Sequence, residues 1–244
     1  MSANIIAIIP ARGGSKGLPG KNLKHFMNHP LIAWPIQYAK ESELNMKILV
    51  STDDPAIASA ASDYGADVPF LRPDEISQDL TTTEETLKFS LEKAEIYYQE
   101  KFDYCIFLTC TDLFRIPGWI EEGLSILKAN TELESVFVAS ETHKNFWTIE
   151  GNKPERYAEW MKVYSSRQIR KTSYREDTGL MSISKSCLWR NGKRIGDNVQ
   201  IISDNRSETS IDIHTEFDLV LANAAIDWIS KNRPLDLPPL PKKK

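Results

Sequence analysis

Residues 5–22 read IIAIIPARGGSKGLPGKN, an apolar run followed by a loop rich in glycine and basic side chains. The apolar run Ile5–Ile9 is short, continuous and β-branched, so it predicts a buried strand. The glycines and prolines that follow predict a loop over residues 10–22. A buried strand that leads into such a loop is typical of open α/β sheets, in which ligands bind beyond the carboxyl ends of the strands.

Strand-like and helix-like segments alternate along most of the remaining chain. Further strands are predicted at residues 47–52, 104–108, 135–139, 180–184 and 199–203, with a short extended piece at 68–71. Helices are predicted at residues 31–42, 54–64, 83–99, 117–129 and 215–230, the second of them capped by an aspartate. This order predicts an α/β fold with a mostly parallel sheet covered by helices.

Two segments depart from the alternation. Residues 142–178 mix aromatic and basic side chains without one clear period, so we expect an excursion from the sheet. Residues 234–244 contain four prolines and end in three lysines, which predicts an extended or disordered Pro/Lys-rich tail. We therefore expect a single domain over residues 1–233, the excursion included, followed by the tail.

Composition limits the classes of partner. The 244 residues carry a net charge of −4, so no overall basic field would attract a nucleic acid or an anionic membrane, and neither is expected as a partner. The run Ile5–Ile9 is too short to span a bilayer and lacks the features of a secretory leader, so a cytoplasmic location is expected. The three cysteines have no CxxC spacing and the histidines no HExxH spacing, which favours reduced thiols and argues against zinc.

The composition of the loop suits a polyphosphate. Glycines 13, 14, 17 and 20 let backbone amides approach phosphate oxygens, while Arg12, Lys16 and Lys21 offset negative charge. A P-loop is excluded, because Ser15 and Asn22 stand where its first glycine and its hydroxyl residue would be. No glycine trio supplies the G-x-G-x-x-G fingerprint of dinucleotide-binding folds. A flexible basic loop without a ligand is the alternative reading.

Four ordered segments resemble the acylneuraminate (sialic acid) cytidylyltransferase family. They are IIPARGGSKGLPGKN at 8–22, STDD at 51–54, FLRP at 70–73 and SIDIHTEFDL at 210–219. The resemblance implies a Rossmann-like α/β domain, CTP as co-substrate, Mg²⁺ as cofactor, pyrophosphate as product and a homodimer.

The resemblance also implies roles for individual residues of the nucleotide site. The family's triphosphate loop matches Arg12, Gly13, Gly14, Ser15, Lys16, Lys21 and Asn22, of which Arg12, Lys16 and Lys21 are the expected catalytic cations. Contacts near the cytidine would come from Arg72 and Thr83, with Thr81 nearby. A surface ion pair for Arg72 and a helix cap for Thr83 are the alternatives. The aspartates of STDD can be explained by capping of the next helix, a role that we favour for Asp54.

Metal ligation is implied at the segment 210–214. Alternation places Asp212 and His214 on one face of an extended piece, where the family has two aspartates that hold Mg²⁺. Asp212 matches the first aspartate and is an expected catalytic residue, whereas His214 replaces the second. Imidazole is a poor ligand for Mg²⁺, so His214 would admit Mn²⁺, hydrogen-bond to a bound water or phosphate, or serve only packing.

The acceptor-binding segment departs most from the family. Residues 108–115 read LTCTDLFR and keep only Leu108, Thr111 and Arg115 of the family's pattern. Candidates for the acceptor are Thr109, Thr111, Asp112 and Arg115, together with Arg167, Gln168, Tyr174 and Arg175 from the excursion. A structural or intersubunit role for the excursion residues is an equal alternative. Cys110 is interpreted as packing rather than as a nucleophile.

These residues predict a cytidylyltransferase that transfers CMP from CTP to an acidic 2-keto sugar, a nonulosonate of the sialic acid type, and releases pyrophosphate. Alternatives are a cytidylyltransferase for another acid, such as a 3-deoxyoctulosonate or a phosphonate, and a catalytically silent nucleotide-binding homologue. A sugar-1-phosphate nucleotidyltransferase fits the loop less well. Aromatic side chains of the excursion are expected to pack against a second copy of the chain.

Overall fold

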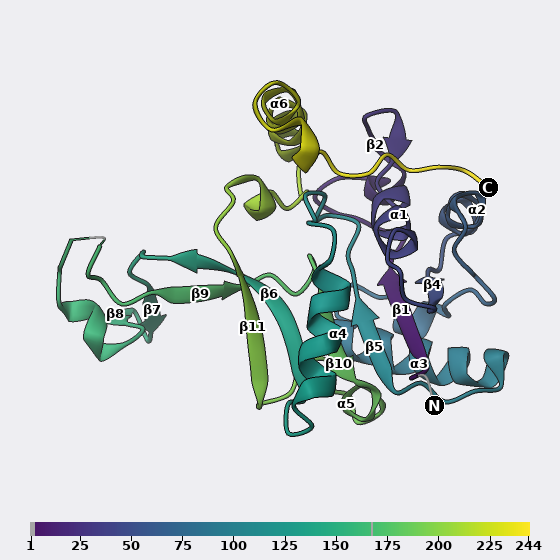
Figure 1. The fold of residues 1–244 in the computed structure, drawn as a ribbon, viewed down its shortest axis with the longest axis horizontal. Helices are drawn as coiled ribbons and strands as arrows, with labels where there is room; N and C mark the ends of the chain where they lie inside the picture. Colours follow the sequence, from purple (N-terminus) through teal and green to yellow (C-terminus); the bar gives the residue numbers. More distant parts are fainter. Residues whose placement is uncertain (1–2, 167) are drawn as a thin grey trace.

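The computed structural model describes residues 3–166 and 168–244, and its main element is a seven-stranded sheet (Figure 1). The strand order is β11-β6-β10-β5-β1-β4, and β9 pairs with the C-terminal half of β6. Its strands are β1 (Ile5–Pro10), β4 (Lys47–Ser51), β5 (Tyr104–Phe107), β6 (Ser135–Thr142), β9 (Ser173–Glu176), β10 (Ser182–Lys185) and β11 (Val199–Asp204). Two small hairpins lie outside it, β2 (His25–Phe26) with β3 (His29–Pro30) and β7 (Trp147–Glu150) with β8 (Lys153–Arg156).

Strand direction confirms the predicted sheet. β1 runs parallel to β4 and β5, and β11 runs parallel to β6. β10 is antiparallel to both β5 and β6, so β5 and β6 share a direction and only β9 and β10 oppose the others within the described chain. The fold is therefore α/β with a mostly parallel, Rossmann-like sheet, into which an antiparallel strand is inserted.

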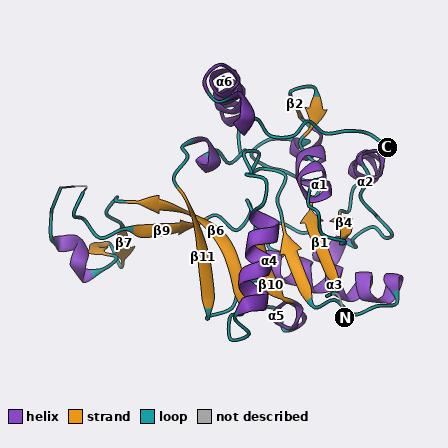
Figure 2. Cartoon of the chain, viewed as in Figure 1, coloured by secondary structure: helices purple, strands orange, loops and turns teal. Residues whose placement is uncertain are grey.

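Helices cover both faces of the sheet (Figure 2). They are α1 (Ala33–Lys40), α2 (Pro55–Tyr64), α3 (Thr83–Tyr98), α4 (Trp119–Ala129), α5 (Ser186–Arg190) and α6 (Glu216–Asn232), with 3₁₀ turns η1 (Lys21–Leu23), η2 (Asp74–Ile76), η3 (Glu159–Lys162), η4 (Glu208–Ser210) and η5 (Pro234–Asp236). Among these residues no helix has both the length and the apolar character needed to cross a membrane.

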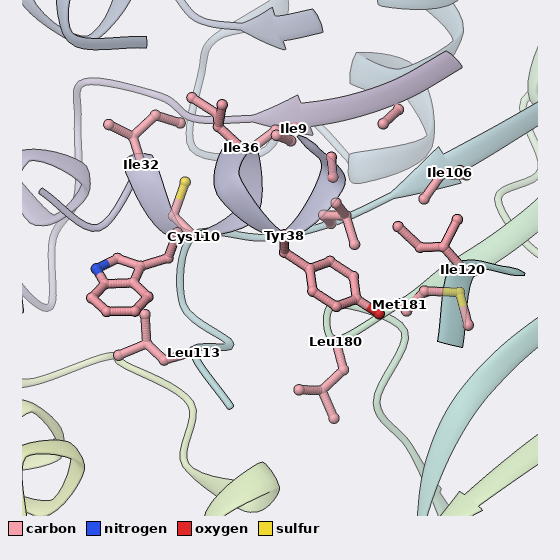
Figure 3. Packing of buried hydrophobic residues seen from close by; sticks show 14 of the residues in the cluster. Ile9, Ile32, Ile36, Tyr38, Ile106, Cys110, Leu113, Ile120, Leu180 and Met181 are labelled. Carbon is pink, nitrogen blue, oxygen red and sulfur yellow. The ribbon is translucent and has the colours of Figure 1, made fainter. Parts of the chain in front are cut away.

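The alternation of β1 divides the core between the two faces. Ile5, Ala7 and Ile9 pack with residues of α1, α2, α4 and α6, whereas Ile6 and Ile8 pack with residues of α3 and α5. Figure 3 shows part of the first cluster, where Tyr38 of α1 lies near Leu180 and Met181. Because both faces of a parallel strand are buried, the strand reads as a continuous apolar run, as the sequence indicated.

Side-chain caps begin three of the helices, and one of these caps was predicted. Asp54 caps α2 by accepting hydrogen bonds from the amides of Ala56 (2.7 Å) and Ile57 (3.4 Å), which confirms the role favoured for it. α3 and α6 begin with capping boxes, in which Thr82 pairs with Glu85 and Thr215 pairs with Asp218. The cap of α3 is thus Thr82, and Thr83 is the first residue of the helix.

The excursion forms an arm that leaves the sheet along β6 and β9, on the left in Figure 1. The β7–β8 hairpin and η3 lie beyond these two strands. Arg156 joins the hairpin to the following segment, because its guanidinium lies 4.2 Å from the ring centroid of Trp147 and donates to the Tyr164 hydroxyl at 2.8 Å. Several aromatic side chains of the arm remain exposed, namely Phe146, Trp147, Tyr157 and Tyr164.

The C-terminal tail is extended and packs against α1 and α2. The Lys242 amide donates to the Gln37 side chain at 3.0 Å, and the Lys244 amide donates to the Asp63 carbonyl at 2.8 Å. Pro238 and Pro241 are buried. Of the two states expected for this segment, the structure has the extended one.

Three local predictions differ from the structure. Residues 68–71 are not a strand, and pairing with β4 is limited to a single bridge between Leu49 and Asp67. α5 was not predicted, because its five residues are too few to show a helical period. The strand predicted at 180–184 begins two residues later, after a turn in which the Leu180 amide donates to the Asp177 carbonyl at 3.0 Å.

Candidate active site

A cleft of about 500 Å³ lies at the carboxyl ends of β1 and β5. Its lining combines the loop after β1, the segment between Arg72 and α3, the end of β5 and the turn before α6. The lining residues are Pro10, Arg12, Ser15, Lys16, Gly17, Lys21, Asn22, Arg72, Ile76, Ser77, Gln78, Asp79, Thr81, Thr83, Thr86, Phe107, Thr109, Cys110, Thr111 and His214. Most residues expected at the nucleotide are therefore gathered in one cleft, whereas Gly13 and Gly14 are outside its lining.

Two of the expected phosphate cations share one carboxylate. Nη1 of Arg12 lies 3.0 Å from Oδ1 of Asp79, and Nζ of Lys16 lies 2.5 Å from Oδ2 of the same residue. These contacts lower the pKa of the Asp79 carboxyl, chiefly through the hydrogen bond from Lys16. The cations thus form a site that an anion already occupies.

Lys21 is the most enclosed cation of the loop. Its ammonium donates to the Ile213 carbonyl at 3.2 Å, and burial lowers its pKa although the nearby Asp212 acts in the opposite direction. A Cβ atom at Gly17 would lie only 2.9 Å from the carbonyl oxygen of His214. Backbone contact at Gly17 and the Lys21 hydrogen bond therefore hold the loop against the turn before α6.

Asp53 connects the loop to Arg72. One oxygen of Asp53 accepts from the Gly13 amide at 3.0 Å and lies 3.6 Å from Nη2 of Arg72. Arg72 is buried, and its Nε donates to the Ser77 hydroxyl at 3.1 Å. Asn22 also holds the loop in place, since its side-chain amide donates to the Arg12 carbonyl at 2.9 Å. Arg72 is thus part of a buried network at the cleft wall rather than of an exposed surface pair.

Asp212 and His214 face each other. Nε2 of His214 lies 2.8 Å from Oδ2 of Asp212, and both side chains are substantially exposed. Within residues 3–166 and 168–244, no group of three or more His, Cys, Asp and Glu side chains is arranged to hold a metal ion. A single exposed carboxylate beside a phosphate-binding loop nevertheless fits Mg²⁺, which usually binds one or two carboxylates plus substrate phosphates and waters.

A half-buried carboxylate lies beside Asp212. Asp112 pairs with Asp212 in an isolated antiparallel bridge, and the Ile213 amide donates to the Thr111 carbonyl at 3.1 Å. Burial raises the pKa of Asp112 to about 6, and the charge of Asp212 adds to this effect. The hydroxyl of Thr109 donates to Asp112. The expected metal turn and the expected acceptor segment are consequently one packed unit.

Arg115 lies inside the protein rather than in the cleft lining. Its guanidinium donates to the carbonyls of Leu180 (2.6 Å), Thr109 (2.6 Å) and Gly179 (2.8 Å). A Cβ atom at Gly179 would clash with the side chains of Asp112 and Thr109, so a larger residue there would displace them. Arg115 and Gly179 together fix the backbone that carries Thr109 and Asp112.

The excursion residues lie apart from the cleft lining. Tyr174 and Arg175 are on β9, where Nε of Arg175 is 2.7 Å from Asp177, and Gln168 is exposed. Arg167 lies outside the described residues. A single chain therefore does not bring Gln168, Tyr174 and Arg175 into the cleft lining with Arg12 and Lys21.

Cys110 is a packing residue. The side chain is buried, and burial raises the pKa of its thiol to about 12, which keeps it protonated at neutral pH. A nucleophilic cysteine needs a lowered pKa. The interpretation of this residue as part of the core is confirmed.

The segment 76–79, Thr86 and Phe107 line the cleft but were not predicted from the sequence. Ile76, Ser77, Gln78 and Asp79 line the cleft between Arg72 and Thr81, two residues that the sequence did indicate. Their position in a short loop between two expected contacts was the available signal. Asp79 gave none by itself, because an acidic residue is not expected at a triphosphate.

Comparisons with known proteins identify a family and similar chains. A family model described as cytidylyltransferase matches residues 6–103. The chain is 31% identical over 239 residues to CMP-N,N'-diacetyllegionaminic acid synthase of Legionella pneumophila, covering 91% of this chain and 96% of that one. It is 31% identical over 192 residues to a pseudaminic acid cytidylyltransferase of Campylobacter jejuni, covering 75% and 79%.

A solved structure shares the fold. The CMP:2-keto-3-deoxy-manno-octonic acid synthetase complexed with CTP matches with a TM-score of 0.69 at 15% identity, over 93% of this chain and 99% of that one. At this identity the likeness concerns the fold alone.

Proposed function

The chain belongs to the cytidylyltransferase family that includes the CMP-N,N'-diacetyllegionaminic acid synthases, and we infer that it transfers CMP from CTP to an acidic nonulosonate sugar. The protein is thus a CTP-dependent nucleotidyltransferase. Its relatives are named for legionaminic and pseudaminic acids, which supports a 2-keto sugar acid as the acceptor class.

One observation carries the proposal most directly. The cleft gathers Arg12, Lys16 and Lys21 from one loop together with Arg72, and Asp212 lies outside the lining, in the turn that Lys21 contacts. Cations of this kind, together with loop amides, neutralise a triphosphate, and most of the catalysis of phosphoryl and nucleotidyl transfer is positioning and charge neutralisation. No covalent nucleophile is needed.

The reaction that we propose is an in-line attack by the anomeric hydroxyl of the acid on the α-phosphorus of CTP. The new bond joins that oxygen to CMP, the bond to the β-phosphate oxygen breaks, and pyrophosphate leaves with the electron pair. Arg12, Lys16 and Lys21 stabilise the charge that develops on the leaving group. Thr81 and Thr83, on the wall that carries Arg72, are proposed to contact the nucleoside.

Asp212 is the proposed ligand of Mg²⁺. When bound there, the ion would neutralise phosphate charge and orient the reacting oxygens. The hydrogen bond between His214 and Asp212 supports a role for His214 in orienting that carboxylate. Such an outer partner fixes the direction in which a ligand points.

The acceptor side combines the segment 109–115 with the arm. Thr109, Thr111 and Asp112 are proposed to form the floor of the acceptor site, and Arg115 supports it from behind. The exposed aromatic residues of the arm support packing against a second copy of the chain. We propose that this homodimer brings Gln168, Tyr174 and Arg175 to an acceptor site.

The experiment that tests this function measures pyrophosphate release from CTP with a panel of acids. The panel contains legionaminic, pseudaminic and sialic acids, a 3-deoxyoctulosonate and a phosphonate, each assayed with Mg²⁺ and with Mn²⁺. We expect release with at least one nonulosonate and none with UTP in place of CTP. Tight binding of CTP without turnover on any acid would indicate a silent homologue instead.

A further inference from the structure

The carboxylate of Asp79 occupies the position between two cations of the phosphate loop. Both of its oxygens are used, with Arg12 at 3.0 Å on one and Lys16 at 2.5 Å on the other. These same cations are the ones that a triphosphate would require. Because Lys16 and Arg12 lower the pKa of Asp79, the carboxyl is ionised at neutral pH and behaves as a bound anion.

The segment that carries Asp79 is fixed at its two ends. Before it, the Ser77 hydroxyl accepts from Nε of Arg72 at 3.1 Å and donates to the Pro73 carbonyl at 2.9 Å. After it, Thr82 forms the capping box of α3. These contacts hold Ser77 and Thr82 whether or not Asp79 is paired.

Between the anchors, residues 78–81 have little to hold them. Gln78, Asp79 and Leu80 are exposed, and the side chain of Leu80 is 92% exposed. Besides the Asp79 ion pairs, the segment meets the phosphate loop through the Gln78 carbonyl, 3.5 Å from Nη1 of Arg12. Movement of this segment would therefore cost few buried contacts, a property of loops that open locally.

A triphosphate and an ionised Asp79 exclude each other at Arg12 and Lys16. The Asp79 carboxylate and a phosphate bound to the same cations would repel each other. The N–H groups of Arg12 and Lys16 that donate to Asp79 also cannot donate to the phosphate at the same time. We propose that Asp79 is an affinity-determining residue, an internal competitor that nucleotide must displace from Arg12 and Lys16 by moving residues 78–81. The identity of the nucleotide rests on the function proposed above, whereas the competition rests on these three side chains.

The test compares the wild-type protein with Asp79→Asn and with Asp74→Asn. Asp74 lies in η2, before the anchor Ser77, and carries the same charge, but no ion pair is found for its side chain in the part of the chain that the structure describes. Calorimetry without divalent metal measures the Kd of inorganic tripolyphosphate, CTP and cytidine for each protein. Each titration is done at low salt and again in about 0.5 M KCl, which screens exposed charges.

Asp79→Asn should bind tripolyphosphate and CTP roughly three- to tenfold more tightly than the wild type, as expected for the loss of two exposed ion pairs. The difference should shrink at high salt, and the Kd of cytidine should stay the same. Asp74→Asn should change each Kd less than about twofold, because its charge is not paired.

Equal or weaker binding of tripolyphosphate by Asp79→Asn would overturn the competition, as would tripolyphosphate that binds neither protein. An equal gain for Asp74→Asn would also overturn it, since the effect would then be one of net charge. If tripolyphosphate binds as expected but CTP does not bind, the proposed function would be contradicted and the inference about Asp79 would stand.

Discussion

The ammonium group of Lys21 donates a hydrogen bond to the carbonyl oxygen of Ile213, 3.2 Å away, although 192 positions separate the two residues in sequence. This contact joins the loop after β1 to the turn before α6. Gly17 approaches His214 in the same region. The loop that carries the proposed triphosphate cations is thereby held against the turn that carries the proposed metal ligand Asp212.

The cations of the loop should be essential for turnover. Lys21→Ala and Arg12→Ala should each lower kcat/KM by at least about a hundredfold, because each removes a charge-assisted contact to the transferring triphosphate. Steady-state kinetics measure this loss, and thermal unfolding should change little. Lys24→Ala is the matched control, since Lys24 pairs with Glu216 on the outside of the protein. Near-normal kinetics for both loop variants would remove the loop from the mechanism.

Asp212 and His214 should differ in importance. Asp212→Asn should nearly abolish activity, because the amide replaces the charged ligand proposed for Mg²⁺. His214→Asp should preserve activity or shift the preference from Mn²⁺ toward Mg²⁺. Titration of turnover with each ion distinguishes these effects. Normal turnover of Asp212→Asn at saturating Mg²⁺ would show that the metal ligand lies elsewhere.

The stability of the protein should depend on pH through Asp112. Its pKa is raised from 3.8 to about 6 by burial, so the folded protein binds its proton more tightly than the unfolded chain does. Stability from this group is therefore complete below pH 3.8 and is lost as pH rises through about 6.

Asp112→Asn lacks this titration and serves as the reference. The unfolding free energy of the wild type relative to the variant should fall by up to about 3 kcal/mol between the two pKa values and level off above them. Urea unfolding at a series of pH values measures the difference. A difference that does not change with pH would show that Asp112 has an ordinary pKa.

The arm should mediate assembly. Sedimentation should show a dimer at micromolar concentration, because the arm exposes Phe146, Trp147, Tyr157 and Tyr164. The double variant in which serine replaces both Trp147 and Tyr157 should shift the protein toward the monomer. The wild type sedimenting as a monomer would instead mean that the arm's residues do not reach a partner's site.

Much of the fold followed from local patterns. The continuous apolar run of β1, the aspartate cap of α2 and the threonine at the start of α3 are signals carried by a few neighbouring residues. The directions of most strands could be predicted because a helix between two strands favours parallel pairing. β10 escaped this rule, since the chain turns back within the arm between β6 and β9, and β10 continues in the direction of β9, antiparallel to β6.

The nucleotide side of the site was predictable for a similar reason, because its cations stand together in one loop. The contacts between segments that are distant in sequence could not be predicted. Asp79 is paired with Arg12 over 67 positions, and Arg115 turned out to bind three backbone carbonyls rather than to line the cleft. A sequence shows the residue type in both cases, whereas the partner depends on how distant segments pack.

The central claim is that this chain transfers CMP from CTP to an acidic keto sugar. The most direct measurement follows two radioactive labels with legionaminic or pseudaminic acid as acceptor, one at the α-phosphorus of CTP and the other at its γ-phosphorus. We expect the α-label to enter a sugar product while the γ-label appears in pyrophosphate, and we expect Lys21→Ala to stop both. Transfer of the γ-label to the sugar, or retention of both labels in CTP with every acid of the panel, would contradict it.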